Sequence, residues 1–274
     1  MTKRERRFAS TEPARVSLHD RERTRFGVVN PFTLWRLVVV LMAMSAAGYV
    51  AQRALGPRFG LPLAGLGGGF VSSSMTIAAM GTRARTDPDV LGPAVAGAAA
   101  STVATFIQLA ILVGTASPAL LAKLAWPLAG GGLMAVGYAA IQTWHARRAD
   151  AEAVKGHAFR LGTAIVFGSL VTVIGFVSTA ARAWLGDAGT ITAATIAGLI
   201  DAHSSTAAIG SMSASGRIDD HSAVIAILLA VTTNTITKAI LAVTSGPRRY
   251  WVLVVIGLVL VLATTWMTAL LTSL

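Results

Sequence analysis

The segment GLIDAHSSTAAIG (residues 198–210) decides how this chain is built, because it places Asp201 and His203 two residues apart inside a long apolar run. Hydrophobic residues make up 54% of the 274 residues, and charged residues only 13%. Several windows of about twenty residues carry no charge, which is the length that crosses about 30 Å of hydrocarbon. The composition therefore predicts an all-α, polytopic transmembrane helical bundle.

We expect about eight spans, at residues 32–54, 60–81, 90–114, 118–142, 159–184, 190–213, 222–245 and 249–272. The tail over residues 1–30 carries eight Lys or Arg against four acids, so we expect it in the cytoplasm. Eight full crossings then put two groups of basic residues on opposite sides: Arg83, Arg85 and Arg217 inside, and Lys123, Arg248 and Arg249 outside.

An internal repeat relates the two halves of the chain. An offset of 129 residues lays GFVSSSMTIAAMG (69–81) over the opening segment, and TFIQLAIL (105–112) over NTITKAIL (234–241). We therefore predict two repeats of four spans, joined by a cytoplasmic linker, with bounds of 31–142, 143–158 and 159–274. Four full crossings per repeat would make the repeats parallel, whereas re-entrant second and sixth spans would make them inverted.

Charged residues within the spans are the strongest candidates for function. Asp201 is the one acidic residue predicted in the middle of a span, and Lys238 is the one basic residue predicted deep in a span. Their expected depths differ by roughly 6 Å at the helical rise per residue. We expect either a buried ion pair or a water-filled cavity that serves both, because an isolated charge in hydrocarbon costs several kcal/mol.

Neutral polar residues on the same predicted faces complete the candidate ion site. Its members are Asp201, Lys238, Asn234, His203, Ser204, Ser205, Thr237, Ser72, Ser73 and Ser74. Asp201 and His203 are also the candidate metal ligands, although about 200° of helix rotation separates them, so joint ligation requires a distorted helix. The serines and threonines could instead bond within their own helices, and GLGGGF (65–70) predicts either close helix packing or a helix break.

Other classes of protein are excluded or disfavoured. No cysteine is present, and no nucleophile elbow, HExxH or phosphate-binding loop is found, so we expect no enzyme and no cofactor. The net charge of +11 comes from basic residues at the ends of spans, which argues against nucleic-acid binding.

Short motifs in a fixed order carry a family resemblance. NPFTLW (30–35), VSSSMTIA (71–78), LGDAG (185–189), GLIDAHS (198–204) and NTITKA (234–239) together resemble the bacterial membrane domain of unknown function 4010, which often follows an MgtC/SapB module. No such module is visible in this sequence, so we expect a stand-alone copy. His203 stands where the resemblance implies a second aspartate, which favours a proton or a softer metal over Mg²⁺.

These observations predict an ion transporter or channel of the bacterial inner membrane, with its N-terminus in the cytoplasm. Its partners would be the lipid bilayer and a small inorganic ion, a cation or proton first, and homo-oligomers are left open by the small-residue helix faces. The alternative is a membrane scaffold or regulator in which the polar cluster only holds helices together. A water-accessible Asp201 favours transport, and a dry, directly bonded Asp201–Lys238 pair favours the scaffold.

Overall fold

The computed structural model describes residues 31–55, 60–146 and 186–272, and these ranges are helical with no strand. The helices are α2 (Pro31–Leu55), α3 (Gly60–Thr86), the 3₁₀ turn η2 (Pro88–Val90), α4 (Leu91–Ala116), α5 (Pro118–His145), α7 (Ala202–Ala214), α8 (Asp220–Ser245) and α9 (Arg248–Thr272), with a further helical segment at 186–198. The predicted tail, the predicted span 159–184 and all but the first residues of the predicted linker lie outside the described residues.

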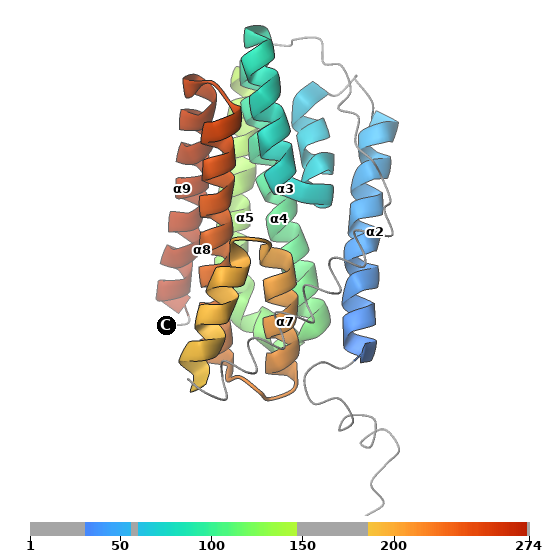
Figure 1. Ribbon diagram of the computed structural model, residues 1–274, viewed down its shortest axis with the longest axis vertical. Helices are drawn as coiled ribbons and strands as arrows, with labels where there is room; N and C mark the ends of the chain where they lie inside the picture. Colours follow the sequence, from blue (N-terminus) through green and yellow to red (C-terminus); the bar gives the residue numbers. More distant parts are fainter. Residues whose placement is uncertain (1–30, 56–59, 147–185, 273–274) are drawn as a thin grey trace, which may run out of the picture.

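Six helices of the described chain are long and apolar enough to cross a membrane. They are α2, α3, α4 together with η2, α5, α8 and α9, and they stand side by side in one bundle (Figure 1). The chain is therefore an all-α, multi-pass membrane protein with lipid-facing helices. Their ends follow local chemistry: Ser117 caps α5 ahead of Pro118, and Asp219 caps α8.

The predicted continuous span over 190–213 is wrong. The helix stops after residue 198 and restarts at Ala202, and the Oγ of Ser205 donates to the carbonyl of Ala194 at 3.1 Å. Eleven residues of straight helix would separate those groups by about 16 Å. The chain therefore doubles back at residues 199–201, and the two arms stand together in the lower half of the bundle (Figure 1). We call residues 186–214 hairpin 2.

Helix α3 also doubles back, at Ser72. That residue has extended backbone angles (φ −166°, ψ 106°) between two helical arms. A Cβ built on Gly97 of α4 would lie 2.8 Å from the carbonyl of Leu61 and 3.1 Å from the methyl of Met80, so both arms pass the same residue. We call residues 60–86 hairpin 1. Its tip, like that of hairpin 2, lies near mid-height of the bundle (Figure 1).

The doubled-back segments change which loops share a side. The guanidinium of Arg85 donates to the carbonyls of Thr244 and Gly246, at 3.0 and 3.1 Å, so the end of hairpin 1 meets the α8–α9 turn. At the other end of the bundle, Lys123 pairs with Asp220 at 3.2 Å. The expectation that Arg83 and Arg85 lie across the membrane from Arg248 and Arg249 is wrong, and so is the separation of Lys123 from Arg217.

Glycines let hairpin 1 approach α4 closely. A Cβ on Gly65 would overlap the backbone of Gly97, and a Cβ on Gly69 would lie 2.6 Å from the Cα of Ser101. Of the two readings of GLGGGF (65–70), close packing is therefore the one that these two glycines serve. The break comes later, at Ser72, where a hydroxyl can cap the following arm.

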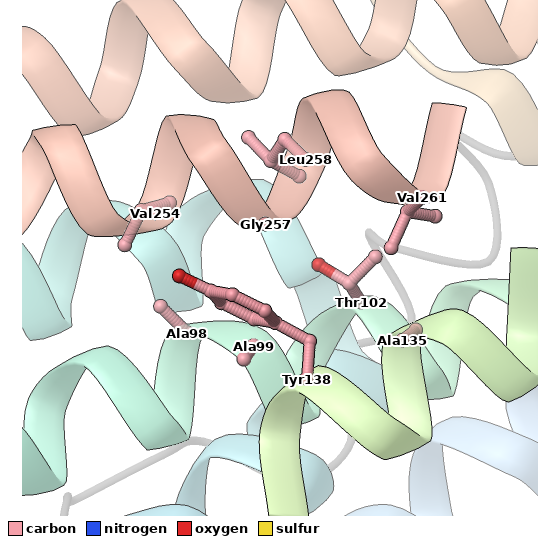
Figure 2. Close-up of a pocket in the computed structure, with 9 residues that line it drawn as sticks. All are labelled: Ala98, Ala99, Thr102, Ala135, Tyr138, Val254, Gly257, Leu258 and Val261. Atoms are coloured by element: carbon pink, nitrogen blue, oxygen red, sulfur yellow. The ribbon is translucent and has the colours of Figure 1, made fainter. Parts of the chain in front are cut away.

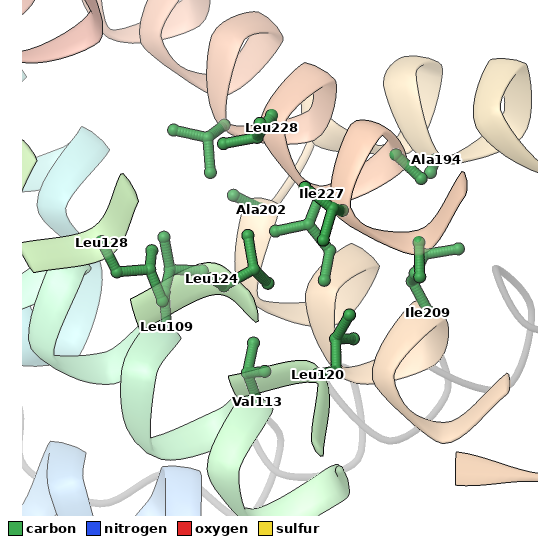
Figure 3. Close-up of a cluster of buried hydrophobic side chains, with 14 of the residues drawn as sticks. Leu109, Val113, Leu120, Leu124, Leu128, Ala194, Ala202, Ile209, Ile227 and Leu228 are labelled. Atoms are coloured by element: carbon green, nitrogen blue, oxygen red, sulfur yellow. The ribbon is translucent and has the colours of Figure 1, made fainter. Parts of the chain in front are cut away.

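Hairpin 2 is held by a cluster of buried apolar side chains contributed by both halves of the chain. Figure 3 shows Ala194 and Ala202, from the two arms, facing Ile227 and Leu228 of α8, while leucines of α4 and α5 close the other side. Leu109 and Leu124 in this cluster are fully buried. Apolar burial thus fixes hairpin 2 against helices of the first half.

Candidate functional site

Asp201 stands at the tip of hairpin 2 and caps α7. Its carboxylate accepts from the backbone N–H groups of His203 and Ser204, at 3.1 and 2.8 Å, and from the Oγ of Ser204. A helix start leaves its first N–H groups without carbonyl partners, and aspartate is among the residues that satisfy them best. The break in hairpin 2 is therefore coupled directly to the acidic residue inside the bundle.

His203 contacts the same carboxylate. Its Nδ1 lies 2.8 Å from Oδ1 of Asp201, because the extended backbone at Asp201 (φ −159°, ψ 118°) removes the helical rotation that would have separated the two side chains. An ionised carboxylate only accepts, so Nδ1 carries the shared hydrogen and a neutral ring presents a lone pair at Nε2. Within the described ranges, this Nε2 is buried and has no hydrogen-bond partner.

Lys238 lies on α8 and is buried, with 2% of its surface exposed. Its Nζ donates to the Oγ1 of Thr105 at 2.9 Å, and Thr105 donates in turn to the Oγ of Ser73 at 2.9 Å. The expected direct pair with Asp201 is not found: no oxygen of Asp201 forms an ion pair with Nζ in the described chain. The lysine instead links α8 through α4 to the tip of hairpin 1.

The two tips are held in the same way, at positions 129 residues apart. The Nε2 of Gln108 donates to the carbonyl of Phe70, and the Oγ1 of Thr237 donates to the carbonyl of Leu199, each at 2.9 Å. Each carbonyl belongs to the last residues before a break. The residue at the equivalent place on α4 or α8 thus supplies the hydrogen bond that the interrupted helix lacks.

Caps and glycine contacts obey the same offset. Ser72 accepts from the N–H of Met75 at 3.3 Å, as Asp201 accepts from Ser204. A Cβ on Gly69 would meet Ser101 and Ala104, and a Cβ on Gly198 would meet their counterparts, Ala230 and Thr233. The repeat seen in the sequence therefore recurs in individual contacts of the folded chain.

The remaining candidate residues divide into contacts within hairpins and polar groups without partners. Ser204 bonds to Asp201, and Ser205 ties the arms of hairpin 2 together. Asn234 is buried and, in the residues that the structure covers, neither it nor Ser74 makes a side-chain hydrogen bond. The prediction omitted Thr105 and Gln108 from the site, although the 129-residue offset equates them with Asn234 and Thr237.

The predicted metal ligation by Asp201 and His203 lacks further ligands. No group of three or more His, Cys, Asp or Glu side chains lies together in the described parts of the chain. Structural zinc sites use four protein ligands and catalytic ones three, so this pair alone suits a proton better than a tightly held metal.

The pocket in Figure 2 lies elsewhere, between α4, α5 and α9. Alanine and valine side chains line it, with Thr102 and Tyr138 as its polar members, and the phenol of Tyr138 donates to the carbonyl of Leu253 at 2.6 Å. It holds no charged side chain, so the charged residues at the hairpin tips are the stronger candidate for an ion site.

Comparisons with known proteins come down to one family. No curated protein and no solved structure gives a significant match to the chain. Residues 39–246, which include both hairpin tips, Thr105 and Lys238, match the model of a family described as Domain of unknown function (DUF4010). The chain belongs to this family of proteins with a domain of unknown function, DUF4010.

Proposed function

We propose that this protein is an ion transporter in which Asp201 and His203 bind and release a cation, a proton in the first place. The observation that carries the proposal is the position of the carboxylate–imidazole pair at a helix break inside the bundle, with one imidazole nitrogen unpartnered. Ionisable groups within membrane spans are costly and mark ion pathways. Broken helices supply free backbone groups where transporters bind their ions.

The architecture behind this proposal is a pair of inverted repeats, each with one re-entrant hairpin. Hairpin 1 opens toward the end of the bundle that holds Arg85, and hairpin 2 opens toward the end that holds Lys123 and Asp220. Inverted repeats with ion sites at their interface allow the two sides of the membrane to be served alternately. We place the protein in the bacterial inner membrane as a carrier, not as an enzyme.

The competing proposal is a scaffold in which the polar cluster is structural. A dry Asp201–Lys238 pair would favour it, but Asp201 has no direct contact with Lys238 in the described chain, and 27% of its side chain is accessible. An accessible carboxylate that is not neutralised by a lysine suits an exchangeable ion better than a permanent link between helices.

The test is ion flux into proteoliposomes that hold the purified protein, screened with H⁺, Na⁺, K⁺, Mg²⁺, Zn²⁺ and Cl⁻. Asp201→Asn keeps the cap of α7 and removes the charge, so we expect it to fold and to lose flux. Asp219→Asn is the matched control, because it makes the same change at the exposed cap of α8 and should keep flux. Absence of flux for every ion with folded protein would favour the scaffold.

A further inference from the structure

Lys238 has more hydrogen-bond donors than partners. An ammonium group carries three N–H donors, and in the described residues its Nζ meets one acceptor, Thr105. The side chain is 2% exposed, so bulk water does not supply the rest. A buried charge that lacks both a counter-ion in contact and a full set of hydrogen bonds is strongly unfavourable. This position therefore suits a ligand that accepts hydrogen bonds and carries negative charge.

The hydrogen bonds around Lys238 all point in one direction. Lys238 donates to Thr105, and Thr105 donates to Ser73, which leaves the hydroxyl hydrogen of Ser73 free to donate further. Ser73 is the first residue after the break at Ser72, where the second arm of hairpin 1 begins. The N–H groups and the positive dipole end of a helix start favour an anion there. Ammonium, hydroxyl and helix start thus present donors to one region.

Two further buried side chains near these donors have unused polar atoms. Gln108 lies one turn from Thr105 on α4 and is 2% exposed, and its Oε1 has no partner in the described structure. Asn234 lies one turn from Lys238 on α8 and is 5% exposed, with no side-chain hydrogen bond within the same residues. Buried polar groups are rarely left unpaired, so these amides point to an occupant that the protein alone does not provide.

The charges at the two tips balance when both are loaded. Without ligands, Asp201 and Lys238 carry one negative and one positive charge inside the bundle, and Asp201 attracts Lys238 through space. A proton on the Asp201–His203 pair removes the attraction and leaves Lys238 without a counter-charge. One monovalent anion on Lys238 restores neutrality, so the empty and the doubly loaded states both avoid a net charge in hydrocarbon.

We propose that Lys238 and Ser73, at the tip of hairpin 1, bind a small monovalent anion that is carried together with the proton on Asp201. This inference rests on the proposed function and adds the class of its second substrate. The stoichiometry is one anion per proton, and the transport cycle moves no net charge.

The binding arm of the test uses purified protein in detergent. Thermal stability is measured in chloride, hydrogencarbonate, acetate and dihydrogen phosphate, against gluconate at equal ionic strength. We expect at least one small anion to stabilise the wild type, in proportion to its concentration. Lys238→Met should lose the effect, and Ser73→Ala should weaken binding about tenfold, because one hydrogen bond to a charged ligand is removed. Ser101→Ala is the matched control, since its Oγ bonds back to Ala98 within α4.

The flux arm uses proteoliposomes with an internal pH indicator. We expect an inward gradient of the stabilising anion to drive proton uptake that is unchanged when valinomycin and K⁺ set the membrane potential. Proton flux that persists in gluconate alone would overturn the anion site and leave the proposed function intact. Anion binding without proton flux in any medium would remove the proposed function and keep the site. If Lys238→Met does not fold, the wild-type titration and Ser73→Ala decide, and stabilisation by none of the anions overturns the proposal.

Discussion

At the scale of single residues, the carboxylate of Asp201 has two separable roles. It caps α7 through two backbone N–H groups, and it places a negative charge beside the imidazole of His203. Ser72 occupies the equivalent position in hairpin 1 and keeps the capping role without the charge. The repeat thus contains its own comparison, in which one tip is charged and the other neutral.

Two substitutions separate these roles. Asp201→Asn should unfold at nearly the wild-type temperature, because asparagine caps helices about as well as aspartate, whereas Asp201→Ala should lose about 1 kcal/mol of stability. Both should abolish flux. Thermal unfolding in detergent, together with flux in liposomes, checks the pair. Equal stability of the two variants would show that the cap is unimportant, and flux in Asp201→Asn would exclude the charge from the mechanism.

At the scale of secondary-structure elements, close packing positions the hairpins. Gly69 and Gly198 each lie against the backbone of the neighbouring long helix at equivalent positions. Gly137 on α5, by contrast, has open space where a Cβ would be. These three glycines therefore differ in surroundings while sharing a helical setting, which makes them suited to a direct comparison.

Adding a methyl group should discriminate among them. Gly69→Ala and Gly198→Ala should each cost about 1–3 kcal/mol, because the new Cβ overlaps backbone atoms that cannot move independently. Gly137→Ala should be neutral or stabilise by up to about 1 kcal/mol, owing to the higher helix propensity of alanine. Thermal unfolding measures all three, and a neutral Gly198→Ala would contradict the close docking of hairpin 2 on α8.

The cap of α8 predicts a pH effect outside the membrane-spanning part of the helix. The backbone N–H of Ser222 donates to Asp219 and holds the pKa of that carboxyl below its usual range. The capping contribution is therefore fully present above the unfolded-state pKa of about 3.9, and it is lost as pH falls through the lower folded-state pKa.

Acid should consequently weaken the wild type more than a variant that cannot titrate at this position. Between pH 7 and pH 3, the unfolding temperature of the wild type should fall further than that of Asp219→Asn, since asparagine caps without binding a proton. Parallel pH dependences for the two proteins would mean that Asp219 contributes nothing to the cap.

At the scale of the whole molecule, the doubled-back hairpins decide which loops share a side of the membrane. The end of hairpin 1 and the α8–α9 turn meet through Arg85, and the turn between hairpin 2 and α8 lies at the opposite end. Eight full crossings would instead separate the first two regions. The difference is one of topology and can be measured without knowledge of the substrate.

The absence of cysteine makes each introduced thiol the only one in the chain. Thr86→Cys and Arg249→Cys should react with a membrane-impermeant maleimide from the same side of oriented vesicles, and Ser215→Cys from the other side. Detergent-permeabilised vesicles control for burial of the thiol. Labelling of Thr86→Cys and Arg249→Cys from opposite sides would refute the re-entrant arrangement.

The sequence by itself determined the class of protein and the repeat. Apolar runs of bilayer length dictate spanning helices whatever their neighbours, and the offset of 129 residues survives in matching residues. Asp201 and Lys238 also stood out, because charges within apolar runs are rare. The bounds of α4, α5, α8 and α9 lie close to those expected, since these helices depend mainly on local apolar content.

Only the tertiary structure decided the course of the chain at the two breaks. A run such as residues 190–213 is apolar enough for a full span, and what turns it back is a cap at Asp201, a carbonyl bonded by Thr237 and the docking of Gly198 on α8. Those partners are distant in sequence, so periodicity does not reveal them. The same long-range contacts placed Lys238 on Thr105 of the other repeat, 133 residues away, and not on the nearer Asp201.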